Sequence, residues 1–192
     1  MADKIVVING GIGAGKSVVS RILRTLGYEV YDCDSEARRI MDCSPSVRKA
    51  LIANFGMECV NADGTVNRKA LARIVFADAK RLERLNGLVH RLVVDDAARW
   101  AAERGGTVFV ETALLYQSGL DRIADEVWEV EAPRETRATR AASRDNSTLE
   151  EIALRIERQD SYEPARIHPH VRHIVNDGIR ALLPQVLDCL SR

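Results

Sequence analysis

Hydrophobic positions along the chain alternate between short runs rich in β-branched residues and longer stretches with helical spacing. Ile5–Asn9 is an apolar run followed by glycine, which predicts a buried parallel strand. Apolar positions from Val18 to Leu26 then recur at helical spacing, and Gly27 stands where a helix C-cap belongs. Tyr28–Tyr31 predicts a second strand, so the chain opens as a strand, a loop, a helix and a strand.

Residues 35–104 have a mostly helical pattern, without a sustained strand signal. Ser44-Pro45 predicts one helix start, because proline is tolerated at the first helical position. Asn61–Gly64 is a turn signal, and Asn67 is placed to cap the next helix. Leu82–Val93 carries a further apolar helical stripe. This stretch is therefore predicted to be a helical insertion between strands of a sheet.

Three further strands are predicted at Thr107–Glu111, Glu126–Glu131 and Val171–Val175. Pro133 opens an arginine-rich helix, and Thr148 with Glu151 forms a capping box for a helix that reaches about Gln159. A final amphipathic helix is predicted over Ile179–Leu190. Strands that alternate with helices in this way predict an α/β fold with a five-stranded parallel sheet between two helical layers.

The strongest chemical signal is the segment from Gly10 to Ser17, which reads GGIGAGKS and matches the phosphate-binding P-loop pattern. Its glycines allow backbone N–H groups to surround phosphate oxygens, and the following helix adds the positive end of its dipole. Lys16 is predicted to reach the β- and γ-phosphates of a nucleotide, and Ser17 to contact Mg²⁺. A strand before the loop and a helix after it favour this reading over a chance glycine-rich turn.

Two carboxylates follow the second predicted strand, where functional groups of open α/β sheets gather. Asp34 is a candidate base for an attacking hydroxyl, or equally a helix N-cap. Strand alternation predicts that Asp32 and Asp34 share one face. Glu111 ends the third strand and resembles a Walker-B-type acid that contacts Mg²⁺ through water; a structural role is its alternative.

Basic and polar residues supply the remaining candidates. Four arginines occur between positions 134 and 144, and most are interpreted as a solvated helix face. Arg140 and Arg144 are singled out, because they lie four residues apart on one face and such arginines can neutralise phosphoryl charge. On pattern alone His90 is a core or groove histidine rather than a ligand. Asn176 follows the last strand and is either a reader of the adenine edge or a turn residue.

Composition narrows the class of protein. The 192 residues are 46% hydrophobic and 29% charged with zero formal net charge, which disfavours a general nucleic-acid or membrane-surface binder. No apolar stretch approaches the ~20 residues that cross a bilayer, and the N-terminal run is too short for a signal peptide. The cysteines lack C-x-x-C spacing and are predicted to be thiols in a reducing compartment. A cytoplasmic protein is therefore expected, with a monomer favoured.

A series of short motifs then occurs in a characteristic order and spacing. They are GGIGAGKS at 10–17, Asp32-Cys33-Asp34 with Ala37-Arg38, Phe55-Gly56 with Asp63–Arg68, Leu85–His90, Leu114–Tyr116 with Gly119-Leu120, Arg140 with Arg144-Asp145, Arg155 with Gln159, and Asn176. Together they resemble the motifs of dephospho-coenzyme A kinases over essentially the whole chain. The spacing that corresponds to D-x-D-x-x-A-R is the most discriminating single match.

This resemblance implies a reaction in which ATP phosphorylates the 3′-hydroxyl of the dephospho-coenzyme A ribose, giving coenzyme A and ADP. It implies that Asp34 is the base, that Asp32 supports it, and that Arg38 and His90 line the substrate side. It also implies catalytic roles for Lys16 and Arg140 and Mg²⁺ as the metal. The nucleotide-binding set that it implies is Gly11, Gly13, Ala14, Gly15, Lys16, Ser17, Val18, Arg144 and Asn176.

The resemblance also implies three parts of the chain: a nucleotide-binding core of residues 1–34, 105–133 and 165–192, an acceptor-binding insertion of residues 35–104, and a lid of residues 134–164. Some positions depart from the family pattern. Arg91 replaces a proline, so the helix that carries His90 is expected to continue. Ala113 and Gln117 replace a proline and a glutamate, which removes a carboxylate from position 117.

Two other functions are compatible with the P-loop. One is another small-molecule or nucleoside kinase with a P-loop, such as a shikimate-type enzyme; the D-x-D-x-x-A-R spacing and the long insertion argue against it. The other is a nucleotide-dependent switch without enzymatic activity on an acceptor. Guanine-nucleotide switches usually carry an N-K-x-D motif, which this chain lacks.

Overall fold

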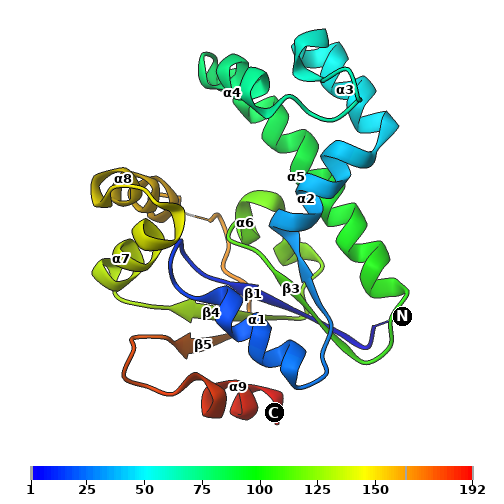
Figure 1. The fold of residues 1–192 in the computed structure, drawn as a ribbon. Coiled ribbons are helices and arrows are strands. Elements are labelled where there is room, and N and C mark those ends of the chain that lie inside the picture. Colours follow the sequence, from blue (N-terminus) through cyan, green and yellow to red (C-terminus); the bar gives the residue numbers. More distant parts are fainter. Residues whose placement is uncertain (1, 163, 192) are drawn as a thin grey trace. The chain divides into compact units, whose positions relative to one another are not determined.

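The computed structural model describes residues 2–162 and 164–191 and separates the chain into two compact units, Met1–Tyr31 with Arg99–Arg192, and Asp32–Ala98. The strands form one sheet in the order β2-β3-β1-β4-β5 (Figure 1). Their bounds are β1 (Lys4–Asn9), β2 (Val30–Asp32), β3 (Thr107–Glu111), β4 (Glu126–Glu131) and β5 (Val171–Val175). The predicted five-stranded parallel sheet is therefore confirmed.

The second strand begins later than the sequence pattern predicted, at Val30 rather than Tyr28. Helix α1 (Lys16–Thr25) is followed by Gly27 in a left-handed conformation, with φ of 92°. The Tyr28 N–H then donates to the Leu23 carbonyl at 3.0 Å, which keeps Tyr28 in the helix-ending turn. The chain becomes extended only after this turn has closed.

The core of the first unit lies between the sheet and the helices α1 and α9 (Leu182–Leu190), and α1 packs against β1, β3 and α9. Phe109 of β3 and Trp128 of β4, the two strands that flank β1, have ring centroids 5.1 Å apart. The buried members of this core are Val6, Ile8, Ala14, Val19, Leu23, Phe109, Trp128, Val130, Ile174, Val186 and Cys189. Ala14 belongs to the P-loop, so the loop is anchored directly in the core.

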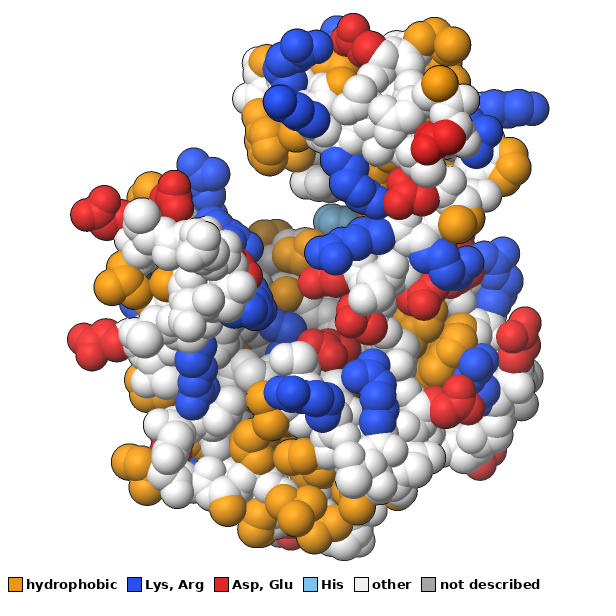
Figure 2. Space-filling view, viewed as in Figure 1, with side chains coloured by type: hydrophobic (Ala, Val, Ile, Leu, Met, Phe, Trp, Pro, Cys, Tyr) orange, Lys and Arg blue, Asp and Glu red, His pale blue; other side chains and the backbone are white. Residues whose placement is uncertain are grey.

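The final helix begins at Leu182, three residues later than predicted. The cause is a side-chain turn: the Asp177 carboxylate accepts the N–H groups of Ile179 and Arg180 at 2.9 and 2.8 Å. Ile179 is 91% exposed as a result. Apolar side chains are visible at the surface over α9 and α1 in Figure 2.

The second unit is helical, as predicted, and contains α2 (Cys33–Cys43), α3 (Pro45–Phe55), η1 (Met57–Cys59), α4 (Arg68–Phe76) and most of α5 (Ala79–Ala102). The predicted helix starts are confirmed, because the side chains of Ser44 and Asn67 accept backbone N–H groups from Val47 and Ala70. The predicted turn is also confirmed by the Gly64 N–H, which donates to the Asn61 carbonyl at 3.0 Å.

Helices α7 (Arg134–Asp145) and α8 (Leu149–Asp160) form a hairpin in the first unit. The predicted capping box is confirmed, since Thr148 and Glu151 exchange side-chain and backbone hydrogen bonds. Ala141, Ile152 and Ile156 form a small buried core between the two helices. The short elements α6 (Leu115–Ser118) and η2 (Leu120–Arg122) precede β4.

Two predictions from composition can be compared with the structure. All four cysteines, which lie in the described part of the chain, are thiols rather than disulfides. Within residues 2–162 and 164–191, no helix combines the length and the apolar character needed to cross a membrane.

Candidate functional site

The P-loop connects β1 to α1 and is closely surrounded by its neighbours. Gly13 and Gly15 have φ of 76° and 101°, a region that favours glycine. A Cβ atom on Gly15 would lie 2.0 Å from Nδ2 of Asn176, and one on Gly13 would lie 2.1 Å from the Arg137 carbonyl oxygen. These two positions therefore require glycine for both backbone conformation and space.

Lys16 and Ser17 occupy the first turn of α1, directly after the loop. The Lys16 ammonium donates to the carbonyl oxygens of Gly10 and Gly11 at 2.8 and 3.3 Å, so its charge lies over the start of the loop. Ser17 is exposed and Val18 is half-buried. The strand, loop and helix predicted around GGIGAGKS are confirmed, and the arrangement presents backbone N–H groups and a cation at a helix N-terminus.

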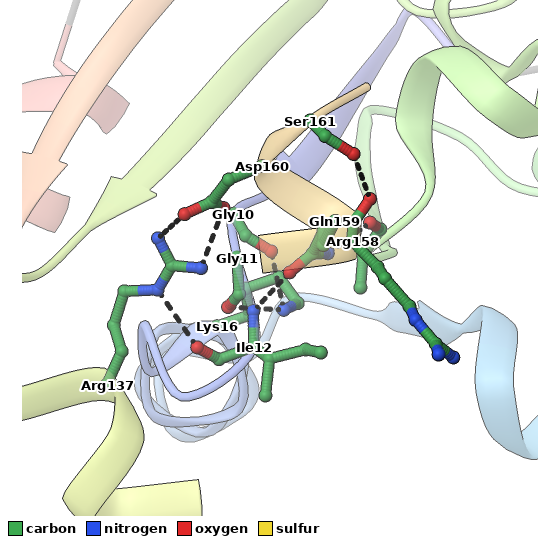
Figure 3. Close-up of polar contacts among 10 residues, drawn as sticks. Gly10, Gly11, Ile12, Lys16, Arg137, Arg158, Gln159, Asp160 and Ser161 are labelled. Carbon is green, nitrogen blue, oxygen red and sulfur yellow. Dashed lines mark hydrogen bonds and ion pairs between the residues drawn. The ribbon is translucent and has the colours of Figure 1, made fainter. Parts of the chain in front are cut away.

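Two side chains at the end of α8 contact the P-loop and its surroundings (Figure 3). The Ile12 N–H donates to Oε1 of Gln159 at 2.7 Å, and Nε2 of Gln159 donates to the Ala113 carbonyl at 2.9 Å. Asp160 pairs with Arg137, whose Nε also donates to the Ile12 carbonyl at 3.0 Å. The α7–α8 hairpin is therefore bonded to both peptide groups of Ile12.

The interpretation of Arg137 as part of a solvated helix face is wrong. Its side chain is only 13% exposed, because the guanidinium lies between the P-loop and Asp160. Helical spacing identified which arginines share a face of α7. Helical spacing could not predict that Arg137 contacts the P-loop, because Ile12 lies 125 residues away in the sequence.

Arg140 and Arg144, the two arginines singled out from the sequence, have different partners. Nη1 of Arg140 donates to the Asn176 carbonyl at 2.9 Å. Arg144 donates to both carboxylate oxygens of Asp145, at 2.7 and 3.2 Å, and Arg155 donates to Asp145 at 2.8 Å. Hydrogen bonds from Arg144 and then Arg155 lower the pKa of Asp145 to about 2. Arg140 thus lies beside the last strand, and Arg144 belongs to an exposed charge cluster.

Asn176 directly follows β5 and lies against the P-loop. Its side chain is buried and donates from Nδ2 to the Ala14 carbonyl at 2.8 Å. Its backbone N–H donates to the Glu131 carbonyl at 2.7 Å, which extends the β4–β5 pairing by one residue. The sequence placed Asn176 at the end of a strand, but it gave no signal for this bond to the loop.

A cavity of about 360 Å³ lies beside the loop. Its lining includes Gly10, Gly11, Gln117, Glu129, Gln159 and Asp160. Glu129 accepts a hydrogen bond from Nδ2 of Asn9 at 2.7 Å, and burial raises the pKa of its carboxyl group. Gln117 stands where the resembling motif has a glutamate, so the cavity is lined by an amide rather than a carboxylate at this position.

Asp32 and Asp34 differ in local structure, which corrects two predictions. Asp32 ends β2, and its Oδ1 accepts the N–H groups of Asp34 and Ser35 at 3.0 and 3.2 Å, so Asp32 is the N-cap of α2. Asp34 lies inside the first turn of α2 and is not the cap. Because the helix begins at Cys33, strand alternation does not relate the two carboxylates.

Two of the residues predicted to bind the acceptor lie on one exposed side of α2. Asp34 and Arg38 are both exposed and four residues apart, so they lie on the same side of the helix. His90 is half-buried in α5, which continues through Arg91 as expected. In the first unit, Glu111 is the last residue of β3 and pairs with Ile8 of β1. Its carboxyl group therefore lies at the end of the strand next to the one that leads into the P-loop.

Comparison with known proteins gives one consistent result. The family model for dephospho-CoA kinase matches residues 4–181. A dephospho-CoA kinase of Porphyromonas gingivalis is 38% identical over 181 residues, which are 94% of this chain and 89% of that protein. A crystal structure of TT1252 from Thermus thermophilus is 30% identical with a TM-score of 0.80, covering 100% of this chain and 97% of the other.

A dephospho-CoA kinase structure from Campylobacter jejuni is 21% identical, with a TM-score of 0.67, and covers 100% of this chain and 96% of its own. At that identity the likeness concerns the fold alone. This chain therefore shares its fold with a solved dephospho-CoA kinase.

Proposed function

The chain belongs to the dephospho-CoA kinase family, and we propose that its P-loop unit binds ATP while its helical unit binds the acceptor. The reaction is the transfer of the ATP γ-phosphate to the 3′-hydroxyl of the dephospho-CoA ribose, which gives coenzyme A and ADP. The complete loop from Gly10 to Ser17, in its strand-loop-helix context, is the observation that carries the donor side. Under this proposal residues 35–104 form the acceptor insertion, residues 134–164 the lid, and the remainder the core.

The donor site is proposed to use the loop backbone, the side chain of the loop lysine and three further side chains. The N–H groups of Gly11, Gly13, Ala14, Gly15, Lys16, Ser17 and Val18 are assigned to the phosphates. The Lys16 ammonium lies 2.8 Å from the Gly10 carbonyl and carries the charge that the phosphates need. Arg140 and Arg144 are assigned to the phosphoryl groups. Asn176, beside Ala14, is assigned to the nucleotide.

The acceptor site is proposed to lie on α2 and α5. Asp34 is assigned as the base that accepts the proton of the 3′-hydroxyl, since it is an exposed carboxylate in the first turn of α2. Asp32 is assigned to its support: by capping α2 it fixes the turn in which Asp34 lies. Arg38, on the same side of α2 as Asp34, and His90 are assigned to the bound acceptor.

Mg²⁺ is proposed as the metal, and the residues present fit it. Ser17 offers an exposed hydroxyl after the P-loop lysine, and Glu111 offers a carboxylate at the end of the neighbouring strand. No cluster of three potential metal-ligating side chains occurs among the described residues. That agrees with an ion held through Ser17, water and nucleotide phosphates, which is how Mg²⁺ is commonly bound. When bound, the ion neutralises phosphate charge.

The base assignment is tested by Asp34→Asn, which keeps the shape of the side chain but removes the proton acceptor. Turnover is expected to fall by at least ~10²-fold while ATP affinity is retained, because general-base loss typically costs 10²–10⁴-fold. Asp95→Asn, on the exposed side of α5 in the same unit, is the matched control and keeps full turnover. Near-native turnover of Asp34→Asn excludes Asp34 as the base.

We also propose that the protein acts as a monomer in the cytoplasm, without a nucleic-acid or membrane partner. The zero net charge supports the absence of a nucleic-acid or membrane partner, since proteins that bind such polyanionic partners usually carry an excess of basic residues. Sedimentation at assay concentrations tests it: a single species near 21.3 kDa is expected. A stable larger assembly contradicts the monomer.

A further inference from the structure

Arg137 connects the P-loop to the end of α8 through three hydrogen bonds from one guanidinium (Figure 3). Its Nε donates to the Ile12 carbonyl at 3.0 Å. Its Nη2 and Nη1 donate to the two carboxylate oxygens of Asp160 at 2.9 and 3.3 Å. This two-pronged arrangement fixes the plane of the guanidinium, and therefore the direction of the Nε–H group toward the loop. Neither residue has a role in the reaction described above.

The bond to Ile12 determines the orientation of a peptide group in the loop. No cis peptide occurs in the described residues, so the Ile12 carbonyl and the Gly13 N–H point to opposite sides of one planar trans peptide. By holding the carbonyl on the α7 side, Arg137 directs the Gly13 N–H to the other side. Gly13 is one of the residues whose N–H groups are proposed to bind the phosphates.

The neighbouring peptide group is fixed from the same helix end. Gln159, the residue before Asp160, accepts the Ile12 N–H at 2.7 Å. The Ile12 side chain packs against the buried core of the hairpin, together with Ala138 and Ala142. Arg137 thus acts on a segment whose side chain is already fixed by apolar contacts. What it adds is control over the direction of the backbone.

We propose that Arg137, held by Asp160, is a positioning residue for the nucleotide phosphates, which it influences through the Ile12–Gly13 peptide without touching them. This inference rests on the donor site proposed above. It separates Arg137 from Arg140 and Arg144, whose assigned role is direct contact with phosphoryl groups. It also gives Asp160 a function: without that carboxylate the guanidinium loses its fixed plane.

The test is ATP affinity, measured by equilibrium titration without any acceptor, together with kcat and KM for ATP. Arg137→Gln is expected to weaken ATP binding roughly tenfold, the size that corresponds to losing one charge-assisted hydrogen bond. KM for ATP rises in parallel while kcat changes little, because the lost interaction does not involve the reacting atoms. Arg134→Gln removes the same charge from an exposed position of α7 and leaves both constants unchanged.

Coupling distinguishes positioning from a general loss of charge. Asp160→Asn alone is expected to weaken ATP binding. Combined with Arg137→Gln, it is expected to cause little further loss of ATP affinity. Gly11→Ala supplies an independent route, since its Cβ would lie 2.3 Å from Nη2 of Arg137 and must displace that flexible group. It is expected to weaken ATP binding in the native background and to have little further effect beside Arg137→Gln.

Native ATP affinity in Arg137→Gln overturns the proposal, as do equal losses in Arg134→Gln or fully additive effects of Arg137→Gln and Asp160→Asn. Thermal melting verifies that each variant is folded. If Arg137→Gln does not fold, Arg137→Lys decides: it keeps the charge but not the two-pronged bond, so affinity must still fall. Failure of the wild-type protein to bind ATP contradicts the donor site itself and is a separate result.

Discussion

Replacing Asn176 by alanine tests how the last strand supports the P-loop. The Asn176 side chain is buried and donates to the Ala14 carbonyl at 2.8 Å, and Ala14 is 1% exposed. Asn176→Ala therefore leaves a buried carbonyl without that donor, which costs ~1–3 kcal/mol. A central value of about 2 kcal/mol lowers the melting temperature by about 4–8 °C, since each kcal/mol corresponds to 2–4 °C in a chain of this size.

The assay is thermal melting of the nucleotide-free protein, so that no effect on binding enters the result. Asn54→Ala is the matched control, because Asn54 is exposed on α3 and its amide donates to the Ala50 carbonyl one turn earlier. Its melting temperature is expected to stay within about 2 °C of wild type, the range of surface substitutions. An Asn176→Ala variant that melts at the same temperature as the control would show that this bond does not stabilise the loop.

Three further predictions concern charge and capping. Glu129→Gln is expected to stabilise the protein at pH 7 in thermal melts, because burial raises the pKa of Glu129 and glutamine still accepts from Asn9; destabilisation contradicts this. Thr148→Ala removes the capping box and is expected to cost about 1 kcal/mol in unfolding experiments, whereas Thr148→Ser restores it. The pKa of Asp145 is lowered to about 2 from 3.8, so wild type is more stable than Asp145→Asn above pH 3.8, and this difference closes as the pH falls toward 2. A pH-independent difference argues against the lowered pKa.

Local signals explain why much of the fold was predictable from the sequence. The bounds of β3, β4 and β5 agree with the predicted ones. β3 is a mostly apolar run, as expected of a buried parallel strand, whereas β4 alternates glutamate with apolar residues. Ser44, Asn67 and Thr148 cap helices as predicted, because capping depends on bonds within three residues. The P-loop also carries its conformation in its own glycines.

Contacts between distant segments explain the rest. The burial of Arg137 depends on Ile12 and Asp160, which lie 125 residues before it and 23 after it. No periodicity within α7 reports such partners. Two other errors arose where one local structure replaced another. Asp32 caps α2, so the helix begins at Cys33, whereas strand alternation assumed an extended chain through Asp34. Asp177 forms a turn where a helix was predicted.

Phosphoryl transfer from ATP to dephospho-CoA is tested by comparing acceptors in one assay. ADP release is measured by a coupled assay with ATP and Mg²⁺, with dephospho-CoA, shikimate or a nucleoside as the acceptor. Strong stimulation by dephospho-CoA alone, with coenzyme A formed in equal amount to ADP, is the predicted result. ADP release that dephospho-CoA does not stimulate, or that shikimate or the nucleoside stimulates more, contradicts it.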